Sequence, residues 1–242
     1  MSPTTPSSPS DAGIGTNVVV ESELLDGIGP GASVGLAADD HHHLARVLRM
    51  RSDDRITLTD GRGRWIEALI GDRFSTSGTV TATSECHLAP EPPNVGVAFA
   101  LTKGDKPETV VQKLTELGMR RIVLVRAERS VVRWDDEKSE RNRARLVAVA
   151  RGALGQCRGA WLPEIEFVVS VSALAAHDGV VRADRGGRLV GADDRLIAIG
   201  PEGGWAPSER ELLPDAVGLP GSVLRAETAA IVAATLLAGF AR

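Results

Sequence analysis

The sequence is poor in cysteine and has no long apolar run among its 242 residues. Cys86 and Cys157 cannot form a disulfide framework, and their spacing fits neither a CxxC motif nor a zinc site. No apolar run approaches the length of a membrane-spanning helix. The first ten residues lack the basic and apolar regions of a secretory signal. We therefore expect a cytoplasmic protein that neither spans a membrane nor depends on disulfides.

The composition is that of a globular protein, with 43% apolar and 25% charged residues, and the length suits one large domain or two smaller ones. The N-terminal segment departs from this average, because residues 1–10 contain four serines, three prolines and two threonines. Such a composition cannot offset the entropy that a chain loses on folding. We therefore predict a disordered tail over residues 1–15.

Residues 16–88 predict a small β-rich domain, because short β-branched runs alternate with turn signals such as Asp60-Gly61. The predicted strands are Asn17–Val20, Ser33–Leu36, Ile56–Thr59, Trp65–Ile70 and Thr79–Thr83. One short helix interrupts these strands. Its expected N-cap is Asp39 or Asp40, and its expected apolar face is Leu44, Val47 and Leu48. The pattern favours a small barrel or sandwich with a helical insertion.

A proline-rich break at residues 89–93 begins the second region, residues 89–242, in which predicted strands and helices alternate. The predicted strands are Val95–Leu101, Arg121–Val125, Gly179–Ala183 and Leu196–Ile199. The predicted helices run from Pro107 to a stop at Gly118, from Glu137 to about Arg158, and from Ala226 to Phe240. This alternation indicates an α/β domain with a mainly parallel sheet.

Basic residues are concentrated in two segments, although the net charge of −4 argues against a nucleic-acid partner. Six arginines accompany three acidic residues between Arg46 and Arg64, and eleven basic residues accompany five acidic ones between Arg120 and Arg158. A local positive field attracts a polyanion whatever the net charge of the chain. The second segment is equally well explained as a solvated helix face. Arg46, Arg49, Arg51 and Arg55 are harder to explain in that way.

The predicted strand Leu196–Ile199 runs directly into the sequence Gly-Pro-Glu-Gly-Gly at residues 200–204. Ligands of open α/β sheets bind at the carboxyl ends of strands, where glycines permit a close approach of the backbone. The loop matches neither a Walker A motif nor a dinucleotide fingerprint. It therefore predicts a small-ligand loop, with a simple tight turn as the alternative.

The last predicted helix is apolar on nearly every side, with Ile231, Val232, Leu236, Leu237 and Phe240 among its alanines. Such a helix is buried in a large core or shared with a second subunit. Its first turn carries the polar residues Arg225, Glu227 and Thr228. Polar groups in an apolar setting must be paired or line a site.

Five motifs resemble, in order, those of the ribosomal RNA small subunit methyltransferase E family of the SPOUT superfamily. This family methylates N3 of a uridine in 16S rRNA. The first three motifs are HHLARVLRM at 42–50, KGDK at 103–106 and QKLTELG at 112–118. The fourth is Gln156-Cys157 with Pro163, and the fifth is IGPEGG at 199–204 with VLRAETA at 223–229. The match spans about residues 17–242, which makes chance resemblance improbable. Four residues depart from the family pattern, namely Pro220, Ser222, Gly155 and Gly159. Arg158 lies beside Gly159.

The resemblance implies a PUA-like RNA-binding β-barrel at residues 16–88 and a knotted, dimerising SPOUT methyltransferase domain at residues 89–242. It implies S-adenosylmethionine as cofactor, 16S rRNA of the small ribosomal subunit as substrate, and a homodimer. The cofactor residues it implies are Ile199, Gly200, Pro201, Gly203, Gly204, Leu219, Val223, Leu224 and Thr228, with a third loop near Ala183–Asp184. The RNA-binding residues it implies are Arg46, Arg49, Arg51, Lys103 and Lys106.

Methylation of uridine N3 removes an imide proton and needs no covalent enzyme intermediate, so we expect both cysteines to be structural. Catalysis should rest on orientation and on stabilisation of the uracil's developing negative charge. Arg225 is the candidate for that stabilisation. Glu202 is the candidate proton acceptor, with a loop-ordering hydrogen bond as the alternative.

No metal site is predicted, since consecutive residues such as His41, His42 and His43 point about 100° apart on a helix. Two other functions remain open. One is a SPOUT enzyme that methylates a ribose 2′-hydroxyl or a tRNA base, and the other is a non-catalytic RNA-binding module.

Overall fold

The computed structural model describes residues 6–102, 106–132, 134 and 136–240. The chain forms two compact units. The first contains the residues up to 91 together with 154–162, and the second contains 92–153 and the residues from 163 onward. The proline-rich segment 89–93 contains this division. Nothing in the sequence pattern indicated that residues 154–162 fold with the first unit.

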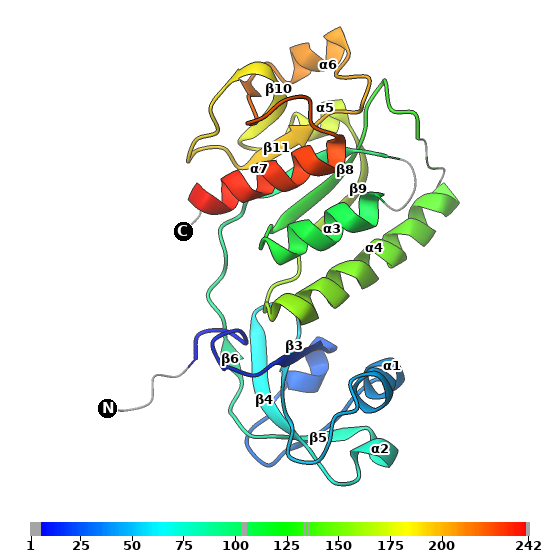
Figure 1. The fold of residues 1–242 in the computed structure, drawn as a ribbon, viewed down its shortest axis with the longest axis vertical. Helices are drawn as coiled ribbons and strands as arrows, with labels where there is room; N and C mark the ends of the chain where they lie inside the picture. The colour runs from blue at the N-terminus through cyan, green and yellow to red at the C-terminus, as the bar shows by residue number, and fades with distance from the viewer. Residues whose placement is uncertain (1–5, 103–105, 133, 135, 241–242) are drawn as a thin grey trace. The chain divides into compact units, whose positions relative to one another are not determined.

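The first unit is built on a mixed six-stranded sheet in the order β1-β3-β4-β5-β2, with β6 paired to β4 (Figure 1). β1 and β3 pair in parallel, and the other neighbours are antiparallel. The strands are β1 (Thr16–Val19), β2 (Ser33–Gly35), β3 (Arg55–Thr59), β4 (Arg64–Ile70), β5 (Thr79–Ala82) and β6 (His87–Leu88). The five strands predicted for this region are confirmed to within a residue or two.

Alternate strand residues face the core of the first unit, as the two-residue period of a strand requires. Ile56 and Leu58 of β3 meet Ile66, Ala68 and Ile70 of β4 in one buried cluster. Trp65 faces the opposite side and packs with Ala89 and Ala160. Full burial of one such large apolar side chain stabilises the folded unit by about 1.5–3 kcal/mol.

Residues 154–162 complete the first unit through backbone hydrogen bonds. The Asn17 side chain donates to the carbonyl oxygens of Leu154 and Gly159, at 3.4 and 3.1 Å. Gly63 donates its N–H to Ala160, and Leu162 donates to Gly61. A Cβ on Gly63 would overlap the Trp161 indole, so this close approach requires glycine.

Two predictions for the first unit are wrong in detail. A disordered tail was predicted over residues 1–15, but residues 6–15 form turns and the apolar side chain of Ile14 is buried. Residues 1–5 lie outside the described part of the chain. The helix α1 (Ala38–His42) begins after Ala37, so neither Asp39 nor Asp40 is its N-cap.

The predicted apolar face of this helix is also wrong. Leu44 is buried, but the side chains of Val47 and Leu48 are 59% and 44% exposed. The reason is that the chain widens into the π-helical turn η2 (His43–Val47) and then enters the left-handed region at Arg49, with φ of 53°. The ordinary helical period therefore does not apply beyond Leu44.

The first unit also contains the one-turn helices η1 (Ser22–Leu25) and α2 (Phe74–Ser77). Neither was predicted from the sequence. Each buries one apolar side chain, Leu25 from η1 and Phe74 from α2. A single turn is too short to produce a helical period that the sequence could reveal.

The second unit is an α/β fold with a six-stranded parallel sheet in the order β12-β10-β11-β7-β8-β9. Its strands are β7 (Gly96–Ala100), β8 (Arg121–Arg126), β9 (Glu164–Ser170), β10 (Val180–Arg188), β11 (Leu196–Ile199) and β12 (Ala216–Val217). Its helices are α3 (Lys106–Glu116), α4 (Asp136–Cys157), α5 (Val171–Leu174), α6 (Pro207–Leu212) and α7 (Ala226–Phe240). The predicted parallel α/β architecture is confirmed, while β9, β12, α5 and α6 were not predicted.

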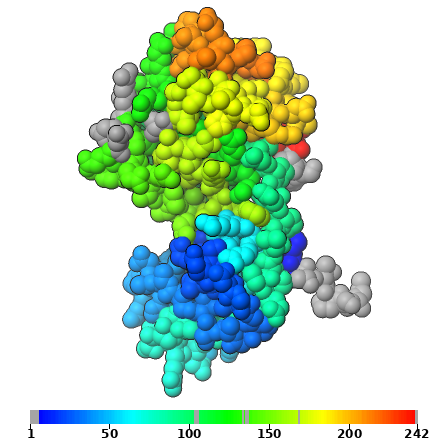
Figure 2. Space-filling model, turned by 180° about the vertical axis from the view of Figure 1, so that it is seen from behind, coloured from blue at the N-terminus to red at the C-terminus, as the bar shows by residue number. Residues whose placement is uncertain are grey.

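Helices cover both faces of this sheet, as parallel sheets require. Helix α7 packs on β7, β11 and α3 on one face (Figure 1). On the other face, Ala98 and Ala100 of β7 pack with Val171 and Leu174 of α5. The space-filling view shows α6, in orange, beside the yellow residues of β10 (Figure 2). The central strands are therefore buried, and their carboxyl ends are where a ligand can enter.

No helix in the described part of the chain is long and apolar enough to cross a membrane.

Candidate active site

The carboxyl ends of β7, β8 and β11 line a cavity of about 180 Å³ in the second unit. Neighbouring parallel strands end at the same edge of a sheet, so three separate segments converge there. The lining residues are Leu101, Thr102, Lys106, Arg129, Val131, Val132, Pro201 and Glu202. The cavity is therefore continuous with the glycine-bearing loop at residues 200–204.

The loop after β11 is fixed by close packing. A Cβ on Gly200 would lie 3.0 Å from the buried indole of Trp205, so a side chain here would require the indole to shift. Gly204 has φ of 70° and donates its N–H to Pro201 at 2.8 Å, which closes a tight turn. The Trp205 Nε1 lies 3.4 Å from the carbonyl oxygen of Ala183, so the loop is tied to β10.

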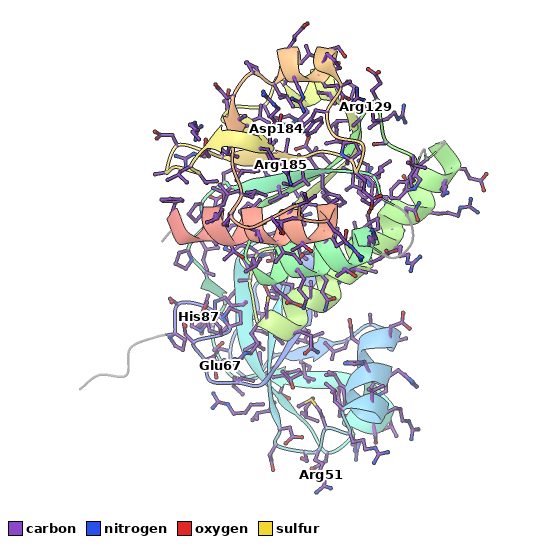
Figure 3. The ribbon with its side chains drawn as sticks, turned by 45° about the horizontal axis from the view of Figure 1, so that its top comes forward. Arg51, Glu67, His87, Arg129, Asp184 and Arg185 are labelled. Carbon is purple, nitrogen blue, oxygen red and sulfur yellow. The ribbon has the colours of Figure 1, made fainter. Side chains whose placement is uncertain are left out.

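Arg129 joins the end of β8 to the same loop. Its Nη1 donates to the carbonyl oxygen of Gly203 at 3.2 Å, and a Cβ on Gly203 would lie 3.3 Å from the Arg129 Cβ (Figure 3). The buried Glu209 carboxylate supports this junction, because it accepts from the N–H of Glu128 at 2.7 Å and of Ala206 at 2.8 Å. One carboxylate therefore fastens the segment beside Arg129 to the start of α6.

Lys106 connects the loop with the start of α7. Its Nζ lies 3.4 Å from Glu202 Oε1 and 3.5 Å from Glu227 Oε1. The Glu202 side chain is 71% exposed, so this pairing is weakened by solvent. Glu227 is different, since its Oε2 is buried and has no hydrogen-bond partner among the described residues. That oxygen can accept a hydrogen bond from, or attract, a cationic ligand.

Asp184 is held between two arginines in the middle of β10. Its Oδ2 lies 3.3 Å from Arg182 Nε and 3.3 Å from Arg210 Nη1 (Figure 3). Arg182 also donates to the carbonyl oxygens of Leu213 and Pro214. The segment near Ala183–Asp184 is thus anchored beside β12 and to the loop through Trp205.

The segment 219–225 precedes α7 and is more open. Leu219 and Leu224 are half-buried, whereas Val223 is 75% exposed. Arg225 and Thr228 are also exposed. The Arg225 carbonyl oxygen accepts from the N–H of Ala229 at 2.8 Å, but its guanidinium has no partner among the described residues. The predicted cofactor residues therefore divide into a packed loop at 199–204 and an open one here.

The predicted RNA-binding arginines are exposed. The guanidinium groups of Arg46, Arg49 and Arg51 have no acidic partner within the described chain, although the backbone N–H of Arg51 donates to Asp54. The Arg51 side chain projects from the first unit (Figure 3). Two neighbouring arginines are instead neutralised, since Arg55 pairs with Glu67, and Arg64 pairs with Asp60 and Asp26. Burial alone would raise the pKa of Asp60, but hydrogen bonds from Arg64 and from backbone groups hold that pKa below its usual range. Lys103 lies outside the described residues.

Thr102, Arg129, Trp205 and Glu209 were not singled out from the sequence. Trp205 follows the predicted loop directly and Glu209 lies five residues beyond it, and this proximity is the only signal that the sequence offered. Thr102 and Arg129 lie at the ends of other strands, so only the folded sheet brings them to the loop. Within the described residues, no group of three His, Cys, Asp or Glu side chains could hold a metal ion.

The chain matches two family models. A model described as an RNA methyltransferase domain matches residues 89–238, and one described as an RNA methyltransferase PUA domain matches residues 36–73. Curated relatives of similar length have the name ribosomal RNA small subunit methyltransferase E. One from Mycobacterium bovis is 30% identical over 84% of this chain and 85% of its own. One from Bacillus subtilis is 29% identical over 82% and 86%.

Solved structures share the fold across both units. Ribosomal RNA small subunit methyltransferase E from Neisseria gonorrhoeae, bound to S-adenosylmethionine, matches with a TM-score of 0.76 and 25% identity, over 91% of this chain and 95% of that one. A Legionella pneumophila protein in complex with the same cofactor matches with a TM-score of 0.79 and 25% identity, over 92% and 96%.

Proposed function

Because the chain belongs to the family of ribosomal RNA small subunit methyltransferase E, we propose that it methylates N3 of a uridine in 16S rRNA. It is an RNA methyltransferase that uses S-adenosylmethionine and acts on small-subunit ribosomal RNA. The choice of uridine N3 rests on the resemblance of the five sequence motifs to this family. The observation that carries the proposal is that the loop 200–204 and Lys106 line one cavity, while Lys106 also lies within 3.5 Å of Glu227 at the start of α7.

The residues at this edge suit S-adenosylmethionine, which carries a positive sulfonium and an apolar adenine. The Glu227 Oε2, buried without a partner in the described chain, and the nearby Glu202 provide negative charge. Leu219 and Leu224 are half-buried and provide apolar surface for an adenine ring. When bound, the cofactor supplies an activated methyl group. The proposed site consists of Ile199–Gly204, Leu219–Arg225 and Thr228, with Ala183–Asp184 as the third loop.

The chemistry at uridine N3 requires loss of one proton and stabilisation of negative charge on the uracil. Arg225 is the proposed stabilising group, and its guanidinium is unpaired within the described residues and exposed, so it is free to turn toward a substrate. Glu202 is the proposed proton acceptor. Its Oε1 lies 3.4 Å from Lys106 Nζ at the cavity, on the loop after β11.

Two further properties belong to the proposal. The exposed side of α7 carries the half-buried Ile231, Val232 and Leu236 and the 51% exposed Phe240, which supports a homodimer through this helix. The family resemblance supports a trefoil knot in the second unit and a closed PUA-like barrel in the first. In the dimer, the first unit holds RNA through Arg46, Arg49 and Arg51. Lys103 and Lys106 are the further proposed RNA-binding residues, and Lys106 lines the cavity. The cytoplasm is the proposed compartment, and action on ribosomal RNA supports it.

Calorimetric titration with S-adenosylmethionine tests the cofactor loop. Gly203→Val should lower the affinity at least tenfold, because its side chain would press on Arg129 and shift the loop. Gly71→Val is the matched control, since a Cβ at Gly71 in the first unit meets nothing within 4 Å. Equal affinity of Gly203→Val and wild type would contradict the assignment of this loop. A wild-type protein without measurable affinity would favour a non-catalytic RNA-binding module.

A further inference from the structure

We propose that two adjoining cavities of the second unit together receive one flipped-out nucleotide of the RNA. In this arrangement the base lies beside the loop 200–204, and its sugar and phosphate lie over Glu108 and Arg145. The inference rests on the proposed function, and it assigns Thr102, Glu108 and Arg145 to recognition of the target nucleotide. An enzyme that modifies a base in folded RNA must take that base out of its stack, so a pocket of nucleotide size is required.

The second cavity adjoins the first and has a volume of about 210 Å³. The two share Thr102 and Val132 in their walls. Each alone is smaller than the roughly 300–1,000 Å³ of a typical small-molecule site, but the two volumes together fall within that range. The second cavity is lined by Thr102, Pro107, Glu108, Val132, Trp134, Lys138, Asn142, Arg145 and Leu146.

Two polar atoms in these walls lack partners. The Thr102 Oγ1, at the junction of the cavities, and the Glu108 Oε2 are both buried without a hydrogen-bond partner among the described residues. A buried polar atom left unpaired costs about 1–3 kcal/mol, so two in one cavity indicate a ligand that satisfies them. The hydroxyl can donate to a uracil carbonyl oxygen. The carboxylate accepts only, and a ribose hydroxyl is the donor that a nucleotide offers it.

The charges around the second cavity suit the phosphate of the same nucleotide. Arg145 Nε donates to Glu108 Oε1 at 2.8 Å, which fixes both groups, yet the Arg145 side chain remains 62% exposed. Lys138 and Asn142 line the same wall from the first and second turns of α4. Guanidinium groups held in place on an exposed rim are well suited to phosphate oxygens.

The remaining walls are apolar. Trp134 is 7% exposed and Leu146 is 1% exposed, and both line the second cavity. These side chains provide a surface for the sugar, while Pro201 and Val131 line the chamber proposed for the base. The order of chambers follows from the cofactor loop, because only the first cavity contains residues of the segment 200–204.

Steady-state methylation of small ribosomal subunits at saturating S-adenosylmethionine tests the proposal, with 3-methyluridine measured by mass spectrometry. Thr102→Val removes only the hydroxyl and should lower kcat/KM about three- to tenfold, the value of one hydrogen bond. Glu108→Gln should lower it by a similar factor. Arg145→Ala should raise KM for the subunit severalfold. All three should bind S-adenosylmethionine with wild-type affinity, as measured by calorimetry.

Arg141→Ala is the matched control, because Arg141 lies one turn earlier on α4, is 72% exposed and does not line the cavity. It should leave KM within twofold of wild type. If wild type is active and Thr102→Val, Glu108→Gln and Arg145→Ala all match Arg141→Ala, the nucleotide pocket is overturned while the proposed function stands. Loss of cofactor affinity in Thr102→Val with full folding would also overturn it, since the cavity would then belong to the cofactor. An inactive wild type would overturn the proposed function and the pocket with it.

Discussion

At the scale of single residues, the second unit is organised by buried carboxylates that accept several hydrogen bonds each. Glu209 fixes the segment beside Arg129, and Asp194 fixes the turn before β11. Arg188 donates to both Asp194 oxygens, at 2.8 and 2.6 Å, and the N–H of Gly191 donates at 2.8 Å. The hydrogen bonds from Arg188 hold the pKa of Asp194 below its usual range, against the opposing effect of burial.

Replacing Asp194 with asparagine should lower the free energy of unfolding by about 1–2 kcal/mol at neutral pH. This is the contribution expected of hydrogen bonds to a charged carboxylate when the partner, Arg188, is partly exposed to solvent. Because the folded pKa is depressed, this stability is fully present above the unfolded pKa of about 4 and is lost as the pH falls below it. The difference in Tm between wild type and Asp194→Asn should therefore shrink in acid. Thermal unfolding from pH 7 to pH 3 measures it, with the exposed Asp193→Asn as control. A difference that grows in acid would contradict the account.

At the scale of elements, the surface formed by the π-helical turn η2 and the following residues carries exposed arginines and no continuous apolar stripe. Replacing Arg46, Arg49 or Arg51 singly with alanine should weaken RNA binding and reduce the slope of log K against log salt by about 0.7–0.9. Cofactor affinity should not change. Binding titrations against a 16S rRNA fragment at several salt concentrations make the measurement.

Arg55→Ala is the matched control for these arginines, because Arg55 is already paired with Glu67. Its salt slope should change less than that of the three unpaired arginines. Equal slopes for all four variants and wild type would mean that the three residues are only surface charge.

Helix α7 carries the second prediction at this scale. Thr235 lies on its exposed side, and its hydroxyl bonds only to Ile231 of the same helix among the described residues, so Thr235→Arg should fold normally. The added charge should convert the proposed dimer into a monomer in light scattering at micromolar concentration. Ala144→Arg adds the same side chain to the exposed side of α4 and should leave the dimer intact. A monomeric wild type would contradict the interface.

The elements differ in how far the sequence could predict them. Strands β3, β4 and β11 and helices α3 and α7 were predicted because their apolar period or their capping residues are local signals. The π-helical turn was missed because its period is not that of an ordinary helix. Strand β9, with the sequence EIEFVVS, was missed although Gly159 and Pro163 separate it from the preceding helix, because its residues 164–166 alternate charged and apolar side chains without a longer apolar run before Phe167. Thr102 and Glu108 could not be predicted, since an unpaired buried oxygen exists only once distant segments have packed together.

At the scale of the whole molecule, the proposed function gives the two units separate tasks in one reaction. The first matches an RNA methyltransferase PUA domain, and the second contains the cavity and the glycine loop. The return of residues 154–162 to the first unit means that the chain passes between the units more than once. We expect the isolated residues 1–91 to fold poorly for this reason, since Asn17 and Gly63 would lose their backbone partners.

Circular dichroism and thermal unfolding of residues 1–91, compared with the full chain, measure this dependence. The fragment should show a Tm at least several degrees lower than the first transition of the full chain, because each lost buried hydrogen bond costs about 1–3 kcal/mol. An unchanged transition would show that residues 154–162 do not contribute to stability.

The central claim is that this chain makes 3-methyluridine in small-subunit ribosomal RNA, and nucleoside mass spectrometry tests it most directly. The measurement compares 16S rRNA from a strain lacking the gene for this chain with the same strain complemented by wild type or by Gly203→Val. The account predicts that 3-methyluridine disappears on deletion, returns with wild type and does not return with the variant. Persistence of 3-methyluridine after deletion, or loss of a 2′-O-methylated nucleoside in its place, would contradict it.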